Sequence, residues 1–326
     1  MSVQSEIDRI ITAVGNAYSK VSEKGGTVPT SQTVANLATA IDSIPAGGGF
    51  PNGTEWTQSN ITSGNFNAVY NANGIWVACG ASYNSGIYYS TDGKTWIQSN
   101  MTAGSFYSVY NANGIWVTGG SGLYYSTDGK TWTQSNMTSG SFLSVYNANG
   151  IWVACGGGNG LYYSTDGKVW TQSNVTNKNI NTVYNANGIW VACGGSYQSG
   201  LYYSTDGKTW TRSDSLGNSN TVYNANGIWV ACGTYSSGLY YSTDGKVWTQ
   251  SNMTTGSFDS VYSANGIWVS CIYSRDTNII YYSTDGKVWT QSNITTGSLS
   301  SVYNANGMWV AAIKNNGLYY SVTWEP

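Results

Sequence analysis

Charged side chains are scarce in this chain of 326 residues. They make up 9% of the sequence, and 13 Lys and Arg against 15 Asp and Glu give a net charge of -2. A typical soluble domain has about 25% charged residues, so hydroxyl, amide and glycine positions must supply most of the polar surface here. Nucleic acids and acidic membranes are bound by clustered Lys and Arg, and we therefore expect neither partner.

Histidine is absent, and so are long apolar runs. Without histidine the commonest general base is missing, and a zinc site would depend on thiolates alone. There is no run of about 18 apolar residues and no secretory signal in the first ten residues, so we expect no membrane insertion. These absences predict a protein made in the cytoplasm that uses no cofactor and no metal.

Repetition is what the chain has in excess. Seven near-identical copies of Val-Tyr-Asn-Ala-Asn-Gly-Ile-Trp place their tyrosines at spacings of 40, 36, 38, 39, 39 and 41 residues. A period near forty with strand signals is typical of a β-propeller, in which each repeat forms one small sheet. The seven tyrosines are Tyr70, Tyr110, Tyr146, Tyr184, Tyr223, Tyr262 and Tyr303.

One repeat predicts one four-stranded blade. Aromatic and β-branched residues dominate four short runs, and an Asn-Gly pair favours a tight hairpin between the first two. We call the strands A to D in chain order. In the second repeat they are expected at residues 108–112, 115–119, 123–126 and 131–135.

The count of strands predicts how the ring closes. There are seven A-B-C units but only six complete turns between strands C and D, and an orphan copy of strand D lies at residues 55–60, before the first strand A. Pairing this copy with the last repeat would leave no open sheet edge. We therefore predict an all-β, seven-bladed β-propeller of four-stranded blades, closed by an N-terminal strand at residues 55–60 that completes the last blade.

The turn between strands C and D carries a recognisable motif. Its Ser-Thr-Asp-Gly-Lys-(Thr/Val)-Trp pattern resembles the Asp-box, or BNR repeat, of sialidase-like propellers, with Asp and Gly adjacent here. The resemblance implies a propeller whose boxes lie away from any active site. Because an aspartate oxygen can accept backbone N–H groups in such a turn, we predict a structural role for Asp92, Asp128, Asp166, Asp206, Asp244 and Asp285.

All five cysteines occupy one position of the repeat, three residues after the Ile-Trp tryptophan. Gly119 and Ala312 take this position in the other two copies, which indicates a slot for a small buried side chain. Equivalent positions in neighbouring blades do not readily bring two Cα atoms within about 7 Å. We therefore predict free buried thiols at Cys79, Cys155, Cys193, Cys232 and Cys271.

The two rims of the predicted propeller differ in sequence. The A-to-B and C-to-D turns form one rim, which is nearly the same in all copies and is called the constant rim below. The B-to-C loops and D-to-A connections form the other, the variable rim, which carries the tyrosines outside the repeat motif. These are Tyr83, Tyr107, Tyr197, Tyr235 and Tyr273, with Arg275 and Asp276 in the longest loop.

One position of the variable rim is expected at the mouth of the central channel. It lies two residues before the strand A valine and reads Asn67, Tyr107, Leu143, Asn181, Asn220, Asp259 and Ser300. Loops also vary when nothing depends on them, but drift does not favour tyrosine, whereas binding surfaces do. Aromatic rings beside Asn, Asp and Arg predict a site for a glycan or a surface protein.

Catalysis is not expected. A sialidase needs three arginines around the substrate carboxylate, but the repeats contain only Arg212 and Arg275. Hydrolysis by paired carboxylates needs two acids across one pocket, and no spacing argument joins Asp214, Asp259 and Asp276. The chain is therefore predicted not to be an enzyme, and a degenerate glycoside hydrolase is a distant alternative.

The first 54 residues form a separate region. Apolar positions predict a helix at residues 5–22 and a second at 31–44, and the Gly-rich stretch at 46–54 reads as a linker. The predicted domains are thus 1–45 for attachment or oligomerisation, 46–54 as linker and 55–326 as propeller. Ile7, Val14 and Val21 at seven-residue spacing allow a homo-oligomer, whereas a small cap on the propeller is the other interpretation.

This helical region resembles the N-terminal region of tail or virion proteins encoded by phages and prophages of Gram-positive bacteria. The likeness covers Ile7-Asp8-Arg9-Ile10, Glu23 to Pro29 and Ser43-Ile44-Pro45. It implies that the helices bind virion or tail proteins, that the protein leaves the cell by lysis, and that the propeller binds a host-surface glycan or protein. A free lectin-like or protein-interaction scaffold propeller is the alternative.

Overall fold

The computed structural model divides the chain into two compact units, Met1–Gln58 and Ser59–Pro326. Each unit is described by itself. The structure describes residues 14, 17–19, 21, 28, 30–31, 33, 36, 59–61, 64–80, 86–195, 200–213, 219–233, 237–264, 266–272, 280–292, 298–305, 308–314 and 317–321.

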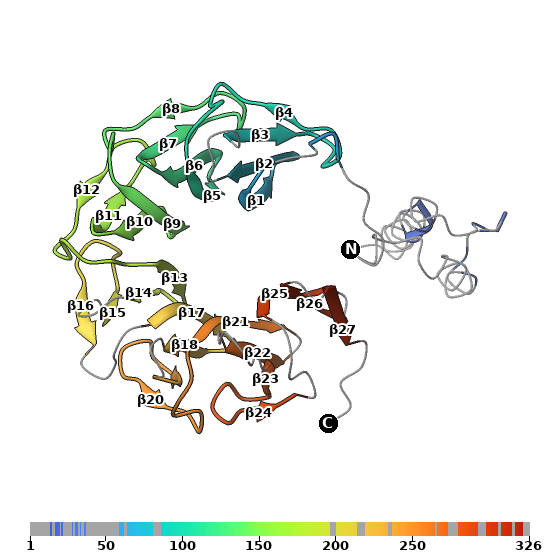
Figure 1. Cartoon of the computed structure of the whole chain (residues 1–326). Coiled ribbons are helices and arrows are strands. Elements are labelled where there is room, and N and C mark those ends of the chain that lie inside the picture. Colours follow the sequence, from blue (N-terminus) through green and yellow to red (C-terminus); the bar gives the residue numbers. More distant parts are fainter. Residues whose placement is uncertain are drawn as a thin grey trace, which may run out of the picture. The chain divides into compact units, whose positions relative to one another are not determined.

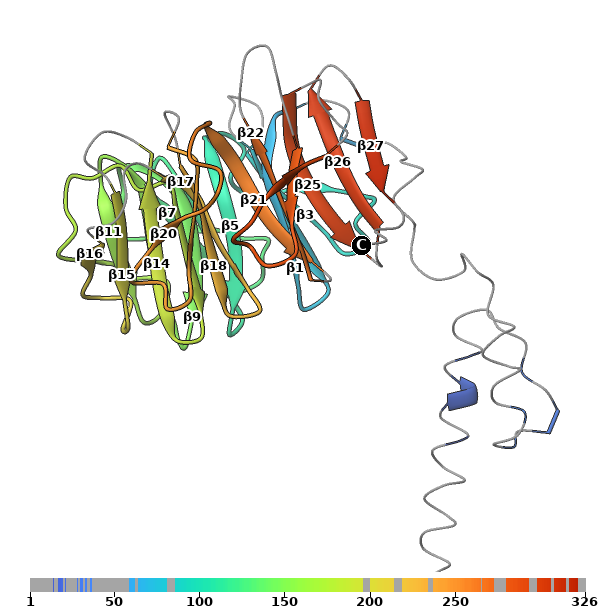
Figure 2. The ribbon, with the colours of Figure 1, turned by 90° about the horizontal axis from the view of Figure 1, so that it is seen from below.

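The second unit is built from small antiparallel sheets that follow one another along the chain. Six sheets have four strands each and a seventh has three described strands, always in chain order across the sheet. Figure 1 shows strand A of each sheet innermost and strand D outermost, and Figure 2 shows the strands running between two rims. The all-β propeller prediction is confirmed, and each sheet is one blade, numbered 1 to 7 in chain order.

The two inner strands of every blade form a hairpin. Strand A is β1 (Phe66–Ala72), β5 (Phe106–Ala112), β9 (Ser141–Ala148), β13 (Thr182–Ala186), β17 (Ser219–Ala225), β21 (Phe258–Ala264) and β25 (Ser298–Ala305). Strand B is β2 (Ile75–Gly80), β6 (Ile115–Gly120), β10 (Ile151–Gly157), β14 (Ile189–Gly194), β18 (Ile228–Gly233), β22 (Ile267–Ile272) and β26 (Met308–Lys314).

The two outer strands are shorter. Strand C is β3 (Ile87–Ser90), β7 (Leu123–Ser126), β11 (Gly160–Ser164), β15 (Gly200–Ser204), β19 (Leu239–Ser242), β23 (Ile280–Ser283) and β27 (Gly317–Ser321). Strand D is β4 (Ile97–Gln98), β8 (Thr133–Gln134), β12 (Thr171–Gln172), β16 (Thr211–Ser213), β20 (Thr249–Gln250) and β24 (Thr290–Gln291).

The hairpin turn between strands A and B has the backbone that its sequence demands. Asn113 and Gly114 have φ angles of 51° and 77°, the left-handed values that a two-residue hairpin requires and that Asn-Gly tolerates best. Strand D of this blade was expected at 131–135 but spans only Thr133–Gln134. It starts later because the backbone N–H groups of Lys130 and Thr131 bond to Asp128 instead of to a strand.

Each blade packs against the next through one repeated apolar cluster. The earlier blade contributes two strand B side chains and the first aliphatic side chain of strand C, and the later blade contributes strand A side chains and two tryptophans. Burying one such aromatic ring removes about 150–250 Å² from water, on the order of 4 kcal/mol gross. Between blades 1 and 2 the cluster comprises Val77, Cys79, Ile87, Phe106, Val109, Trp116 and Trp132.

An asparagine clasp joins the outer edges of neighbouring blades. Asn100 follows strand D of blade 1; its Nδ2 donates to the Trp132 carbonyl at 2.9 Å, and the Trp132 N–H donates to Asn100 Oδ1 at 2.8 Å. The same pair of bonds recurs four more times, so these asparagines hold the blades together. The other clasps are Asn60–Trp96, Asn136–Trp170, Asn174–Trp210 and Asn252–Trp289.

The first clasp is made by the end of the orphan strand D copy. Asn60 bonds to Trp96, and the Ile61 N–H donates to Ser59 Oγ at 3.1 Å, as the Met101 N–H does to Ser99 Oγ in blade 1. Residues 59–61 thus have the bonds of a strand D end. The rest of the predicted closing strand, residues 55–58, lies outside the described residues, so its pairing with blade 7 and the domain boundary at 55 stay predictions.

The N-terminal unit has a small core of its own. Residues 14, 17–19 and 21 are helical, in line with the predicted first helix, and Tyr18 and Val21 are buried against Val14 and Val28. The Tyr18 hydroxyl donates to the Thr33 carbonyl at 2.7 Å, which ties the helix to the segment that follows. Most of the predicted second helix lies outside the described residues. In the described part of the chain no helix has the length and apolar character needed to cross a bilayer.

Candidate functional site

The constant rim is built from box turns in which every carboxylate is engaged. In blade 2, Ser126 Oγ donates to Asp128 Oδ1 at 2.8 Å, and the N–H groups of Lys130 and Thr131 donate to the same oxygen at 2.8 Å each. Ser126 Oγ in turn accepts the Gly129 N–H at 2.9 Å. The corresponding bonds recur in all six turns, with Asp92, Asp128, Asp166, Asp206, Asp244 and Asp285 as acceptors.

These bonds stabilise the ionised carboxylate. The backbone N–H groups of Thr95 and then Lys94, with the Ser90 hydroxyl, lower the pKa of Asp92 to about 2. Burial opposes the shift in the other five turns, but the same hydrogen bonds outweigh it and the pKa is lowered there too. A carboxylate with a low pKa and three donors is a poor general acid, so the turn geometry is structural.

Five of the six box-turn lysines contact a tyrosine ring. Lys130 of blade 2 places its Nζ 5.7 Å from the centre of the Tyr89 ring in blade 1, within the range of a cation–π contact. Four further turns repeat this contact with the preceding blade, so the lysines help to join blades. The other pairs are Lys168–Tyr125, Lys208–Tyr163, Lys246–Tyr203 and Lys287–Tyr241.

The repeat tyrosines form a continuous belt along the inner strands. Tyr70 and Tyr110 have ring centres 4.9 Å apart at 44°, and each following pair is tilted in the same way at 4.9–5.3 Å. Tyr70 also meets Trp116 of the next blade edge to face. Burial and the neighbouring tyrosines raise the pKa of Tyr146 far above its usual range. Sequence reasoning assigned these residues to the frame but missed the belt, since it arises only when blades lie side by side.

The buried cysteines of the repeat have low reactivity. Cys79, Cys155, Cys193 and Cys232 are buried and form no disulfide, as predicted, whereas the side chain of Cys271 lies outside the described part. Burial raises the pKa of Cys79 to about 12, so its reactive thiolate is not populated near neutral pH. Across the described residues, no three His, Cys, Asp or Glu side chains are grouped as metal ligands.

Most of the predicted binding residues fall in loops beyond the described ranges. Of the eleven candidates, the structure describes the side chains of Asn67, Tyr107, Asn181 and Asn220, which all lie at the start of strand A. Asp259 lies in β21, with only its backbone described. The candidates outside the described residues are Tyr83, Tyr197, Tyr235, Tyr273, Arg275 and Asp276.

The three asparagines among the four described candidates make hydrogen bonds between neighbouring blades. Asn67 Nδ2 donates to the Phe106 carbonyl of the next blade at 2.8 Å, and Asn181 Nδ2 donates to Asn220 Oδ1 at 2.9 Å. Tyr107 is half-buried, and within the described part of the chain its hydroxyl forms no hydrogen bond. The structure therefore brings together the residues of blades 4 and 5, Asn181 and Asn220, in direct contact.

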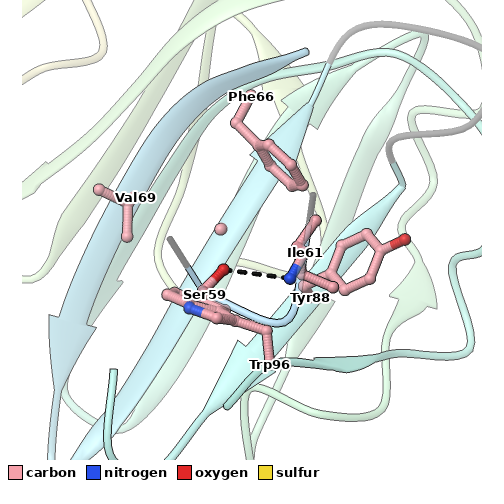
Figure 3. Close-up of a pocket in the computed structure, with 7 residues that line it drawn as sticks. Ser59, Ile61, Phe66, Val69, Tyr88 and Trp96 are labelled. Atoms are coloured by element: carbon pink, nitrogen blue, oxygen red, sulfur yellow. Dashed lines mark hydrogen bonds between the residues drawn. The ribbon is translucent and has the colours of Figure 1, made fainter. Parts of the chain in front are cut away.

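A pocket on the face of blade 1 is a second candidate. It has a volume of about 250 Å³, and Figure 3 shows Phe66 and Tyr88 above Trp96 around it. The strand A and B side chains Phe66, Val69 and Trp76 on this face are 38–57% exposed, whereas their equivalents in blade 2 are 1–7% exposed. The equivalents pack against the preceding blade, so this face of blade 1 is where the last blade of the predicted ring would pack, and we do not take the pocket as a ligand site.

Comparisons with known proteins agree on the fold. No family model matches the chain, and no curated protein matches it. Among solved structures, YCF48 bound to D1 peptide has a TM-score of 0.57 at 14% identity and covers 82% of this chain and 94% of its own. The WD40 β-propeller domain of Doa1 has a TM-score of 0.51 at 11% identity over 79% and 96%.

A third solved structure is an enzyme. An inactive virginiamycin B lyase from Staphylococcus aureus, crystallised with quinupristin, has a TM-score of 0.61 at 7% identity and covers 81% of this chain and 97% of its own. At these identities the likeness shows the propeller fold alone. Because the same fold carries peptide binders and a lyase, function must be argued from the site.

Proposed function

We propose that this chain is a non-enzymatic binding propeller of a phage tail or virion, which recognises a host-surface glycan or protein through the variable rim. One observation carries the proposal. The constant rim uses its carboxylates and lysines to hold turns and neighbouring blades together, whereas the side chains that differ between copies gather at the other rim. Such differences let the rim contact one ligand at several chemically distinct points, whereas seven identical blades would present seven identical contacts.

The absence of suitable acid-base groups supports a binding role over catalysis. The six box carboxylates accept three hydrogen bonds each, and the chain has no histidine. Of the remaining candidate acids, Asp214 follows strand D of blade 4 in the sequence, whereas Asp259 and Asp276 both belong to blade 6, in strand A and in the B-to-C loop. Glycoside hydrolysis needs two carboxyl groups about 5–9.5 Å apart, so the support for a binding role comes from the engaged box carboxylates and the missing histidine.

The N-terminal unit supports display on a particle. Tyr18 and Val21 are buried within it, so this region has its own small core, and its sequence resembles the N-terminal region of phage tail and virion proteins. In this proposal the helices bind virion proteins, with self-association as a second use, and the protein reaches the outside by lysis. The Asp-box kinship of the turns belongs to the same proposal, since it places binding away from the boxes.

The test is binding of the full chain to a glycan array and to host-surface proteins. Replacing Tyr273 and Arg275 together by Ala should weaken binding by about tenfold or more, the effect of losing a central contact. Thr131→Ala, on the exposed constant rim, is the matched control and should leave binding unchanged. Cleavage of a bound glycan would refute the non-enzymatic assignment, and equal loss in the control would refute the choice of rim.

A protein-interaction scaffold is the second candidate function. The fold is shared with YCF48, whose structure contains a bound peptide, and propeller rims can accept a protein segment in the same way. This candidate predicts that the full chain captures a defined protein partner and ignores every glycan. The same variants apply, because the variable rim is the expected contact in both cases.

A further inference from the structure

The inner strand of the blades contains a β-bulge at its variable-rim end. In blade 1, Phe66 pairs with Gly80 and Ala68 with Cys79, so Asn67 between them has no partner in the register. The same shift leaves out one residue in five further blades. The unpaired residues are Asn67, Tyr107, Leu143, Asn220, Asp259 and Ser300.

Blade 4 reaches a similar arrangement by another route. Its strand A begins at Thr182, which pairs with Cys193, and the N–H of the preceding Asn181 also donates to the Cys193 carbonyl at 2.8 Å. Two successive residues thus face one residue of strand B, as in a bulge. All seven blades therefore place one residue outside the ladder at the same point of the innermost strand.

This point coincides with the sequence position that varies most within an otherwise constant strand. The residue before the bulge is buried in the blade interface where it is Phe106, Phe142, Ile180 or Phe258. The residue after it is small in every blade, being Ala, Ser or Thr. Packing therefore restricts both neighbours, whereas the bulged residue ranges over amide, aromatic, aliphatic, acid and hydroxyl side chains.

Bulges of this kind re-aim a side chain and are frequent beside functional sites. Here they also order the side chains along the ring, because Asn67 bonds to the carbonyl just before the Tyr107 bulge and Asn181 bonds to Asn220. An asparagine amide can form about four hydrogen bonds. The bond between Asn181 and Asn220 uses one donor and one acceptor site, so the pair keeps capacity for a ligand.

We propose that the six bulged residues and Asn181 determine ligand specificity, and that they bind a neutral glycan at the mouth of the channel. The proposal rests on the binding role of the variable rim and names its specificity position. Tyr107 and Leu143, on adjacent blades, provide an apolar sector for a sugar ring face, and Asn181 and Asn220 provide amides for its hydroxyls. Asp259 is the one charged residue of the seven, which favours a neutral ligand over an anionic one.

The chain offers an exchange test that conserves composition. Tyr107→Asn combined with Asn220→Tyr moves two side chains between equivalent bulges and leaves every other residue in place. The control exchange, Thr131→Val with Val169→Thr, does the same between equivalent exposed positions of two box turns. Both variants of the full chain are applied to an array of neutral and anionic glycans, and their thermal unfolding midpoints are measured.

We expect the bulge exchange to weaken binding to the neutral glycan at least tenfold or to change which glycan is bound, with its unfolding midpoint kept. The control exchange should bind as the unaltered chain does. Tyr107→Asn alone gives blade 2 the residue that blades 1, 4 and 5 already carry, so it tests the same position if the double exchange folds poorly.

The outcomes separate this inference from the proposed function. If the unaltered chain binds a neutral glycan and neither bulge variant changes affinity or selectivity, the bulge residues do not determine specificity and the rim proposal survives. If it binds only anionic glycans or only a protein, the ligand class is wrong. If it binds no glycan and no host protein, the proposed function itself fails.

Discussion

The two rims of this propeller use the same few residue types for opposite purposes. At the constant rim, aspartate, lysine and tyrosine satisfy backbone N–H groups or contact the neighbouring blade, as Asp128 and Lys130 do. At the variable rim, Asn67 and Tyr107 occupy bulges that lie outside the backbone ladder. A chemically suggestive residue is therefore a candidate for function only where the fold does not use all of its bonding capacity.

The largest expected effect concerns the frame on which both rims depend. A chain starting at residue 61 lacks Asn60, its clasp to Trp96 and the predicted closing strand, and should lose cooperative thermal unfolding. The matched control starts at residue 55 and keeps the whole predicted strand, so it should melt like the full-length propeller. Calorimetry measures both, and equal melting of the two chains would contradict the closure.

A smaller loss is expected from opening one clasp. Asn136→Ala removes the bonds to the Trp170 N–H and carbonyl, both of which are part-buried. Two lost hydrogen bonds should lower the free energy of unfolding by about 1–3 kcal/mol, as measured by urea denaturation. Asn159→Ala, at the variable rim, is the control and should cost less, because the bond from the Asn159 side chain to the Ser141 carbonyl is long, at 3.2 Å. A larger loss of unfolding free energy in Asn159→Ala than in Asn136→Ala would contradict the role of the clasp in stability.

Acid should weaken the constant rim selectively. The pKa of Asp92 is about 2 in the folded state against 3.8 for a free carboxyl, so the folded state binds fewer protons. The resulting stabilisation is present above pH 4 and is lost as the pH falls towards 2. The thermal unfolding midpoint should drop as the pH falls through this window. Asp128→Asn removes one of the six titrating turns and should make the drop less steep. A midpoint independent of pH between 4 and 2 would contradict this.

The smallest effect is a gain. In the sequence, Asp214 stands where the described clasps have asparagine, and a carboxylate has no Nδ2 donor. The preceding Ser213 Oγ donates to the Lys246 carbonyl of blade 5 at 3.0 Å. Asp214→Asn should raise the free energy of unfolding by about 0.5–1.5 kcal/mol. Asp259→Asn makes the same chemical change at the variable rim and should give no such gain. Equal urea midpoints for the two variants would contradict the prediction that an asparagine at position 214 forms a stabilising clasp.

Much of the frame could be predicted from the sequence because it is local and repeated. Asn113-Gly114 predicts its hairpin from two residues, and the box turn around Asp128 spans six residues, from Ser126 to Thr131. The cysteine slot followed from comparing copies, since Gly119 and Ala312 replace cysteine there. The length of strand D was overestimated, because the turn uses N–H groups that a strand would need.

The candidate site was predicted less completely. Sequence comparison located the position of Asn67 and Tyr107 by its variation, but it did not indicate the bulge, which depends on the register between strands A and B. It also did not indicate the clasp, because Asn100 and Trp132 are 32 residues apart and meet only when two blades lie side by side.

The sequence by itself determined the blade, its turns and the contrast between the rims, because period, turn chemistry and small-residue slots act within about forty residues. Only the tertiary structure decided which side chains are already engaged. Asn100, Lys130 and the repeat tyrosines are engaged in hydrogen bonds and ring contacts between blades. The register of the inner hairpin leaves one residue per blade outside the ladder, and that choice depends on how two strands pair and not on any residue alone.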